Sequence, residues 1–162
     1  MKTGSMHQGM QPENLIDKEL RLVLKETGLA SEPDTTVPVY TFAMIHAPSG
    51  VAMGEINLRA GYTENIELYR GNIGFTVFEE YRGHRRSGRS CRLLKPFIQS
   101  LGLGMIWLTC NSDNVASQRN LTYAGARYVD TTYITDDSPY AAYYPPQART
   151  KLRYRWDMGL DL

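Results

Sequence analysis

The sequence predicts one α/β (α+β) domain in which a mixed sheet carries helices across it. Segments with period-two apolar patterning fill the first half of the chain, and strand, turn and helix patterns follow one another in the second half. The length of 162 residues and the hydrophobic content of 42% suit a single soluble domain. Residues 1–12 show no periodicity, so we expect a disordered lead or a cloning remnant there and assign the domain to residues 13–162.

Three segments of the first half predict strands. Leucines alternate along ELRLVLKET (19–27), which indicates a strand rather than a helix. Two β-rich segments flank the turn-forming sequence APSG (47–50), so residues 39–61 predict a hairpin. GNIGFTVFEE (71–80) alternates as well, and it predicts a short strand directly before an arginine-rich turn.

A first helix is predicted after this turn. Apolar residues recur at three- and four-residue spacing from Cys91 to Leu101, which predicts an amphipathic helix that Gly102 closes. Pro96 lies inside the pattern, so we expect a kink or an earlier break at that point.

A second strand and helix follow. MIWLTC (105–110) predicts a buried strand, and the next helix is expected from about Val115 to Ala124 with Asp113 or Asn114 as its N-cap. The last two predicted strands are ARYVDTTYI (126–134) and TKLRYRWDM (150–158).

Five arginines lie among the eleven residues from Arg82 to Arg92, although the net charge of the chain is only +1. A strand that turns directly into a helix presents unpaired backbone N–H groups beside the positive end of the helix dipole. Gly83, Ser87 and Gly88 leave room for a phosphate, and the arginines supply forked donors. We interpret this turn as a binding site for a pyrophosphate.

The same basic turn is compatible with a solvated surface or with a nucleic-acid contact. A nucleic-acid binder needs a basic face that spreads over several elements, whereas the other arginines of this chain are scattered among acidic residues. The sequence therefore favours a small anionic ligand over nucleic acid.

Three consecutive motifs carry a family resemblance: VFEEYRGHRRSGRSCRLL before the first helix, IWLTCNSDN, and NVASQRNLTYAGA at the second helix. Their order resembles the GNAT superfamily of acetyl-CoA-dependent N-acetyltransferases over roughly residues 18–157. The resemblance implies a mostly antiparallel sheet with a splayed central strand pair. It also implies acetyl-CoA as the co-substrate and no metal ion.

The family's acyl-CoA signature is Arg or Gln, two residues, Gly, one residue, and Gly or Ala. In the register that we prefer, Arg82 begins the signature, and Arg85 and Ser87 stand where glycines are usual. A second register, from Arg85 through Gly88 to Ser90, restores the first glycine and stays open.

The resemblance also implies how the chain binds the cofactor. Backbone N–H groups from about Arg85 to Gly88 are expected to hold the pyrophosphate, and backbone groups at the end of the preceding strand are expected to hold the pantetheine arm. DNVAS matches the family's N-x-x-S at the second helix. The expected cofactor-binding residues are Phe75, Val77, Phe78, Arg82, Gly83, His84, Arg85, Arg86, Ser87, Gly88, Asn114 and Ser117.

Attack of an amine on a thioester needs a neutral amine, a polarised carbonyl and a proton for the departing thiolate. Glu55 is our first candidate for the base and Glu79 the next, although each is compatible with an ordinary surface role. Asn72 stands where the resemblance implies a glutamate, so it is limited to orienting a water. Tyr123 is the nearest candidate for the acid.

The acceptor side is less defined by the sequence. GLASEPDTTVP (28–38) is too short for the helical pair that walls the acceptor site in the family. The loop 135–149 is the expected substitute, because Tyr140 and Tyr143 bring aromatic surface and Asp136 attracts a cationic amine. The tyrosines are equally compatible with a loop that is simply pinned to the sheet.

These observations predict an N-acetyltransferase that transfers an acetyl group from acetyl-CoA to an amine of a small molecule or peptide by direct attack in a ternary complex. The alternative is a non-catalytic module that binds CoA or nucleic acid. The chain lacks a secretory signal and an apolar run of the about 20 residues that span a bilayer, so we expect a cytoplasmic protein without a membrane partner. A homodimer is compatible with the sequence.

Overall fold

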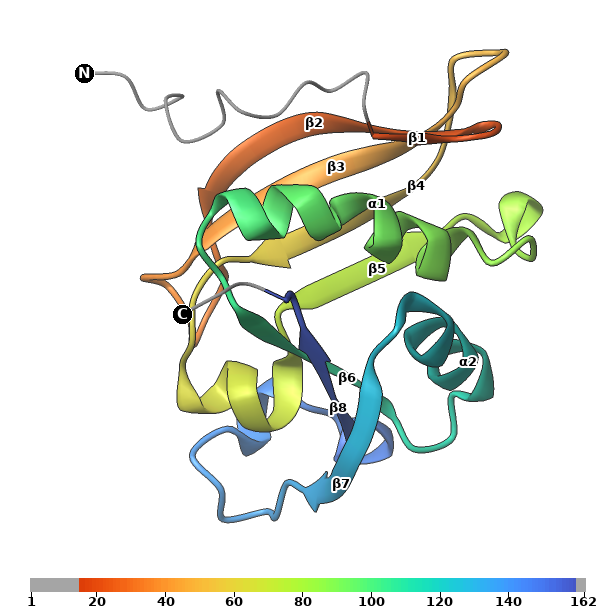
Figure 1. Ribbon diagram of the computed structural model, residues 1–162. Helices are drawn as coiled ribbons and strands as arrows, with labels where there is room; N and C mark the ends of the chain where they lie inside the picture. Colours follow the sequence, from red (N-terminus) through yellow and green to blue (C-terminus); the bar gives the residue numbers. More distant parts are fainter. Residues whose placement is uncertain (1–14, 160–162) are drawn as a thin grey trace.

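The structure is a computed structural model that describes residues 15–159, in which two sheets meet at one edge (Figure 1). The sheets have the strand orders β1-β2-β3-β4-β5 and β6-β8-β7, and every paired neighbour is antiparallel. The expected lead at 1–12 lies outside the described residues. The strands are β1 (Ile16–Asp17), β2 (Leu20–Leu29), β3 (Pro38–His46), β4 (Val51–Arg59), β5 (Ile73–Val77), β6 (Met105–Asn111), β7 (Arg127–Tyr133) and β8 (Thr150–Asp157). The helical segments are η3 (Ile66–Arg70), η4 (Glu79–Tyr81), α1 (Arg86–Ser100), α2 (Val115–Ala124), η5 (Ala141–Tyr143) and η6 (Pro146–Ala148).

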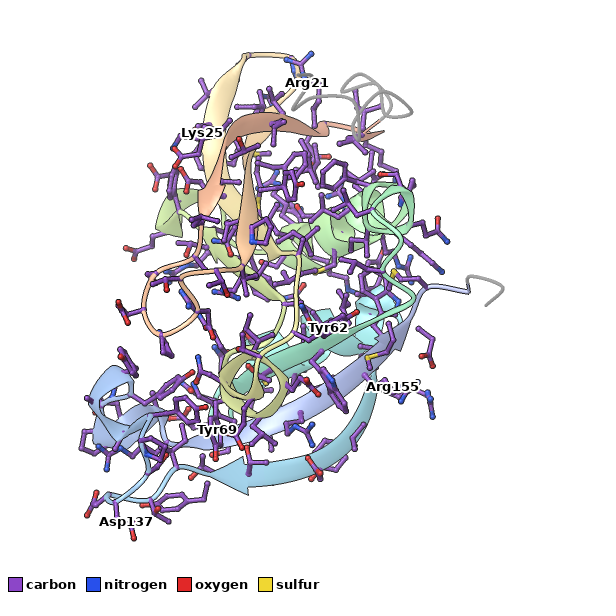
Figure 2. All side chains as sticks on the ribbon, turned by 90° about the vertical axis from the view of Figure 1, so that its left-hand side faces the viewer. Arg21, Lys25, Tyr62, Tyr69, Asp137 and Arg155 are labelled. Atoms are coloured by element: carbon purple, nitrogen blue, oxygen red, sulfur yellow. The ribbon has the colours of Figure 1, made fainter. Side chains whose placement is uncertain are left out.

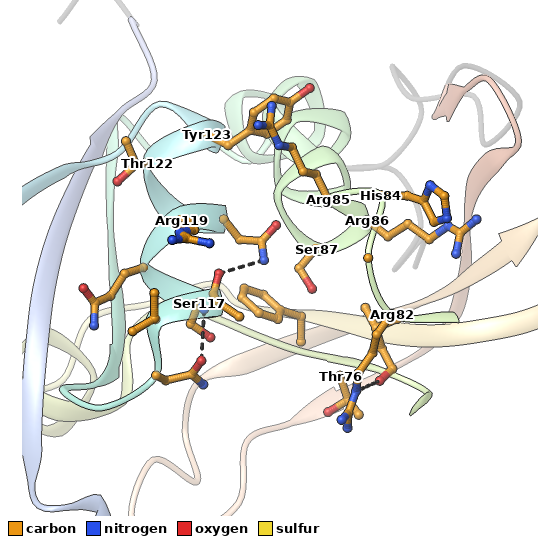
Figure 3. Close-up of a pocket in the computed structure, with 18 of the residues that line it drawn as sticks. Thr76, Arg82, His84, Arg85, Arg86, Ser87, Ser117, Arg119, Thr122 and Tyr123 are labelled. Carbon is orange, nitrogen blue, oxygen red and sulfur yellow. Dashed lines mark hydrogen bonds between the residues drawn. The ribbon is translucent and has the colours of Figure 1, made fainter. Parts of the chain in front are cut away.

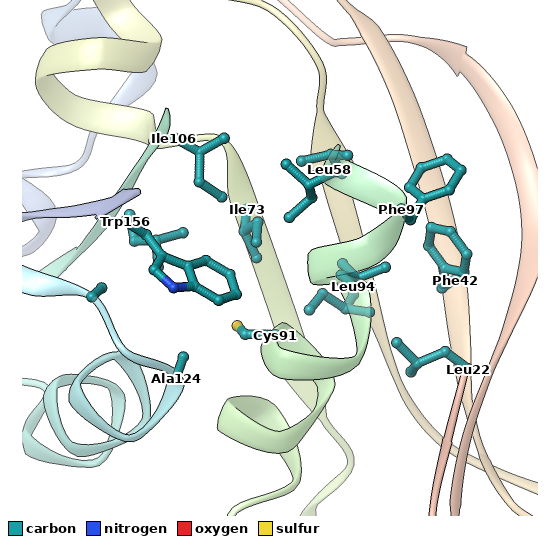
Figure 4. Close-up of a cluster of buried hydrophobic side chains, with 14 of the residues drawn as sticks. Leu22, Phe42, Leu58, Ile73, Cys91, Leu94, Phe97, Ile106, Ala124 and Trp156 are labelled. Carbon is teal, nitrogen blue, oxygen red and sulfur yellow. The ribbon is translucent and has the colours of Figure 1, made fainter. Parts of the chain in front are cut away.

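Helix α1 covers one face of the five-stranded sheet (Figures 1 and 4). Strand alternation brings Leu22, Phe42 and Leu58 to this face, where they are buried. Leu94 and Phe97 of α1 pack on them, and the rings of Phe97 and Phe42 meet edge to face with centroids 5.3 Å apart. The predicted strands, hairpin and amphipathic helix are therefore confirmed, and the core lies between them.

Helix α1 is not broken at Pro96, and it continues to Ser100. Proline lacks the N–H that would bond the carbonyl four residues earlier, so an interior proline costs about 3 kcal/mol. Burial of the apolar side chains on both sides of Pro96 opposes this cost. Gly102 then adopts a φ of 79° and closes the helix as predicted. Across residues 15–159, no helix is long and apolar enough to cross a membrane.

Strands β5 and β6 meet at one end only, beside Asn72. The backbone N–H of Asn72 donates to the Trp107 carbonyl at 2.6 Å, and the Asn72 Oδ1 accepts from the Trp107 N–H at 2.8 Å. The Asn72 Nδ2 donates to the carbonyls of Arg59 and Gly61, both at 2.9 Å. Beyond this point β5 pairs with β4 and β6 pairs with β8. This divergence is the splayed strand pair that the resemblance implied.

The segment between β4 and β5 contains the π-helix η3, which the sequence analysis did not predict. A buried carboxylate, Asp34, holds it in place by accepting hydrogen bonds from Thr63 at 2.6 Å and from Asn65 and Arg70 at 2.9 Å. Three side-chain hydrogen-bond donors from one short segment therefore bind a single carboxylate of the β2–β3 connector.

The opposite face of the five-stranded sheet carries no helix within the described part of the chain. The β2–β3 connector makes only turns, as its length predicted. Lys25 projects from this face, away from α1 (Figure 2). The face is therefore open around Lys25, whereas at the other end of the sheet Val39 packs against Ala30, Val37 and Ile66.

Candidate functional site

A cavity of about 1220 Å³ opens where β5 ends and where α1 and α2 begin (Figure 3). Three regions that are distant in the sequence meet there: the end of β5, the arginine-rich turn and the first turns of α2. The predicted site residues that line the cavity are Phe75, Val77, Arg82, Gly83, His84, Arg85, Arg86, Ser87, Asn114, Ser117 and Tyr123.

The loop before α1 has an uncommon backbone. Gly83, His84 and Arg85 have φ values of 95°, 58° and 53°, and α1 begins directly after them. A left-handed residue followed by a helical one turns successive N–H groups toward a common point, which forms an anion-binding concavity. Arg85, which stands where the signature has glycine in the preferred register, therefore adopts a left-handed conformation that favours glycine.

We expect His84→Gly to raise the free energy of unfolding by about 1 kcal/mol, because a non-glycine residue in the left-handed region costs about 1–2 kcal/mol. His84 is exposed, so little packing is lost with its side chain. Urea denaturation measures the change. His84→Ala is the matched control, because it removes the ring but keeps the Cβ and its strain. Equal stability of the two variants would contradict backbone strain in this loop.

Two expected cofactor residues do not line the cavity. The Gly88 amide donates to the Asn120 Oδ1 at 2.9 Å, and a Cβ on Gly88 would lie 2.9 Å from the Asn120 carbonyl oxygen. Gly88 thus allows α1 to approach α2. The Phe78 amide donates to the Met53 carbonyl at 2.8 Å, and Phe78 is 40% exposed.

The arginines of the turn divide into two groups. Arg86 and Arg89 point to the β1–β2 turn: the Nε of Arg86 binds Glu19 at 3.1 Å, and the Nε of Arg89 binds Asp17 at 2.7 Å. They also donate to the carbonyls of Tyr81 at 2.7 Å and His84 at 3.1 Å. Arg86 reaches the cavity wall, but its charge and that of Arg89 are neutralised by carboxylates. These two arginines fix the shape of the loop.

The other cations remain at the cavity. Arg82 and Arg85 are exposed, and Arg119 of α2 faces the same space (Figure 3). The guanidinium groups of Arg85 and Arg92 lie 5.0 and 3.9 Å from the ring centroid of Tyr123. Sequence reasoning missed Arg119. The helical spacing of Ala116, Arg119 and Tyr123 is the signal that could have found it.

The start of α2 matches its prediction. Asn114 is the N-cap, and its Oδ1 accepts from the Ser117 N–H at 3.0 Å. Both residues line the cavity, so the positive end of the α2 dipole points into it together with that of α1.

Strand β5 offers a free backbone edge to the cavity. The Phe78 N–H points to β4, and successive residues of a strand direct their N–H and C=O groups to opposite edges. The backbone groups of Phe75 and Val77 therefore point into the splay between β5 and β6. The Val77 carbonyl accepts from the Arg82 Nε at 3.2 Å on this side.

The structure places the catalytic candidates apart. Tyr123 lines the cavity, whereas Glu55 lies on β4 in an ion pair with Lys25, and Glu79 is exposed on η4. Asn72 is fully buried, and both atoms of its side-chain amide group are engaged in hydrogen bonds. Asn72 thus shapes the splay and is not positioned to orient a water at the cavity.

The expected acceptor loop packs on η3. The Tyr140 hydroxyl donates to Glu64 at 2.8 Å, and the Tyr140 ring lies 5.8 Å from that of Tyr69. Asp136 is in an ion pair with Arg149, and Tyr143 is exposed. None of the three expected acceptor residues lines the cavity, and these contacts pin the loop.

Burial raises the pKa of Cys91 to about 12 and that of Cys110 to about 11, so both thiols are protonated at neutral pH. Within residues 15–159, no three His, Cys, Asp or Glu side chains gather as a metal site.

The sequence matches no family model and no curated protein. Solved structures are similar in fold. The ribosomal-protein-S5-alanine acetyltransferase from Vibrio fischeri has a TM-score of 0.57 at 10% identity, with 75% of this chain and 62% of that chain covered. The ribosomal L7/L12 α-N-protein acetyltransferase RimL, in complex with coenzyme A, gives 0.58 at 15%, covering 76% and 64%. A GNAT-family acetyltransferase from Bacillus anthracis gives 0.56 at 19%, covering 74% and 67%.

These neighbours define the class of the fold. The chain has the fold of the GNAT acetyltransferases, as the resemblance predicted. It spans about two thirds of the length of these proteins.

Proposed function

We propose that this protein is an N-acetyltransferase of the cytoplasm that transfers an acetyl group from acetyl-CoA to an amine of a small molecule or peptide. One observation carries the proposal: two helix N-termini, a left-handed loop and the free edge of β5 meet in one cavity. Phosphates suit the helix ends, and a pantetheine amide chain suits a free strand edge. RimL, which shares this fold, was solved with coenzyme A.

The residues of the cavity have separate roles in this reaction. Arg82, Arg85 and Arg119 supply charge for the phosphates, and the backbone of Phe75 and Val77 holds the pantetheine arm and the thioester. When bound, acetyl-CoA supplies an activated acyl carbon. The neutral amine attacks this carbon, the N–C bond forms and the C–S bond breaks. The proton lost by nitrogen ends on the thiolate, so the products are an N-acetyl amine and the CoA thiol.

We expect Arg85→Glu/Arg119→Glu to weaken acetyl-CoA binding about 30-fold or more from a micromolar Kd, because both cations face the cavity without a carboxylate partner among residues 15–159. Isothermal titration calorimetry measures the Kd. Arg86 is left intact, because its replacement would remove one of the two arginines that bind Glu19 and hold the loop before α1.

Arg127→Glu/Arg155→Glu is the matched control, since these arginines lie on β7 and β8, outside the cavity. Its affinity should equal that of the wild type. Absence of wild-type binding, or displacement of acetyl-CoA by duplex DNA, would overturn the proposal in favour of a polyanion-binding module. Binding without CoA release over a panel of amines would leave a non-catalytic CoA-binding module.

A further inference from the structure

Strand β4 presents a row of polar side chains on the face away from α1. Ile56 and Leu58 are fully buried under α1, so alternation directs Glu55, Asn57 and Arg59 to the opposite face. Across the ladder, Glu55 pairs with Thr76 and Asn57 pairs with Gly74 of β5. The row therefore runs along β5, and the last residues of β5 line the cavity.

Two polar groups of this row lie over Gly74 of β5. A Cβ at position 74 would lie 3.0 Å from the Arg59 Nη2 and 3.2 Å from the Asn57 Oδ1. The two polar groups thus converge on one point of β5. The next residue along the strand, Phe75, already lines the cavity. A molecule bound by Arg59 and Asn57 would lie next to the position proposed for the thioester.

Arg59 is a partly buried cation without a counter-ion. Its Nη1 donates to the Gly71 carbonyl at 2.9 Å, and within residues 15–159 no carboxylate lies at ion-pair distance from it. Asp34, whose charge acts on Arg59, is bound by Arg70 at 2.9 Å. Burial lowers the pKa of Arg59 to about 10, so the group is charged at neutral pH. A desolvated charge without a partner is costly unless a ligand supplies the opposite charge.

Asn57 supplies a second unsatisfied group. Its Oδ1 is buried and has no hydrogen-bond partner among the described residues. This oxygen accepts hydrogen bonds only, so it complements an N–H donor. Since Arg59 and Asn57 converge on Gly74, they would bind neighbouring groups of one molecule, such as the carboxylate and the nitrogen of an amino acid or peptide.

We propose that the acceptor is an amine that carries a carboxylate, which Arg59 binds while Asn57 orients the nitrogen. The inference rests on the proposed acetyl transfer. Glu55, opposite Thr76 and further along the same row, is the group that takes the first proton from the ammonium before attack and releases it to water. The second proton, which nitrogen loses on attack, ends on the thiolate. Glu55 forms an ion pair with Lys25 on the same face of the sheet.

The test compares each standard amino acid with its amide, and each alanyl dipeptide with its amide, by the rate of CoA thiol release. For the best acceptor we expect kcat/KM to be at least 10-fold higher with the free acid. Arg59→Gln should bring this ratio to about one by raising KM for the acid, and Arg59→Lys should restore it in part. Comparison of the amino-acid series with the dipeptide series shows whether the natural acceptor is an amino acid or a peptide.

Arg155→Gln is the matched control, because it removes an exposed arginine far from the row and should keep the wild-type ratio. An acid-to-amide ratio near one in the wild type, or an unchanged ratio in Arg59→Gln, overturns the inference. If no compound is turned over, calorimetry of acids and amides with the CoA-saturated protein decides: acid-selective binding lost in Arg59→Gln supports the inference, and its absence overturns it. If the wild type does not bind acetyl-CoA at all, the proposed function itself is contradicted, and this outcome is distinct from the others.

Discussion

Replacing Glu19 by glutamine is expected to lower the free energy of unfolding by about 3 kcal/mol at pH 7. Glu19 accepts hydrogen bonds from Arg86 and Arg89 at 3.1 Å, with its side chain 25% exposed. The hydrogen bond from Arg89 lowers the pKa of Glu19 from 4.5 to about 2. Glutamine keeps the shape but loses the charge, so among residues 15–159 Arg86 is left without a counter-ion and Arg89 keeps only Asp17.

The direction of this pKa shift fixes the pH dependence. Because the pKa of Glu19 is lower in the folded than in the unfolded state, its contribution is complete above about pH 4.5 and is lost as the pH falls toward 2. The stability of the wild type should therefore fall more steeply than that of Glu19→Gln in this range. Urea denaturation followed by circular dichroism from pH 7 to pH 2 measures both slopes.

Asp157→Asn is the control for this prediction. Asp157 is 47% exposed and binds Arg127 and Arg155 at the surface, where an ion pair contributes about 0.5 kcal/mol or less. If Glu19→Gln and Asp157→Asn lower the free energy of unfolding equally, the Glu19 contacts stabilise the fold no more than a surface ion pair does.

Gly54→Val is expected to cost about 3 kcal/mol and to weaken acetyl-CoA binding. A Cβ at position 54 would lie 2.2 Å from the Thr76 carbonyl oxygen and 2.9 Å from the Val77 Cα. Both atoms belong to the backbone of β5, so no rotamer change can relieve the contact. The strand must move, and Val77 moves with the cavity wall that it forms.

Gly28→Val makes the same substitution at a strand position with nothing within 4 Å of the added Cβ. Its stability should stay within about 0.5 kcal/mol of the wild type. Thermal unfolding and acetyl-CoA titration of both variants provide the comparison. A Gly54→Val protein as stable as Gly28→Val would contradict the close approach of β4 and β5.

Helix α2 shows how far local chemistry specifies this fold. Asn114 caps the helix, and Gly125 ends it with a φ of 113°. Both signals are residue types with a defined local conformation, so the predicted bounds 115–124 agree with the structure. The β3–β4 hairpin was predictable for the same reason, since its turn sequence and strand alternation are local.

The arginine-rich turn shows where local reasoning stops. The sequence shows that the turn is positively charged, but it does not show which carboxylate each arginine binds. Arg89 binds Asp17 and Glu19, which lie 70 or more positions earlier in the chain. Only the folded sheet brings these carboxylates to the start of α1. The η3 segment was missed for a similar reason, because the buried Asp34 holds it from a distant connector.

The splay of β5 and β6 depends on a side chain instead of a strand ladder, and this restricts which residues can occupy position 72. The Asn72 amide supplies one acceptor to Trp107 and a two-donor nitrogen to the Arg59 and Gly61 carbonyls. Aspartate lacks both donors, serine supplies one, and glutamine places the amide one methylene further away. Fewer residue types can therefore replace Asn72 than can replace the buried apolar residues around it, where side-chain volume alone decides whether a substitution is tolerated.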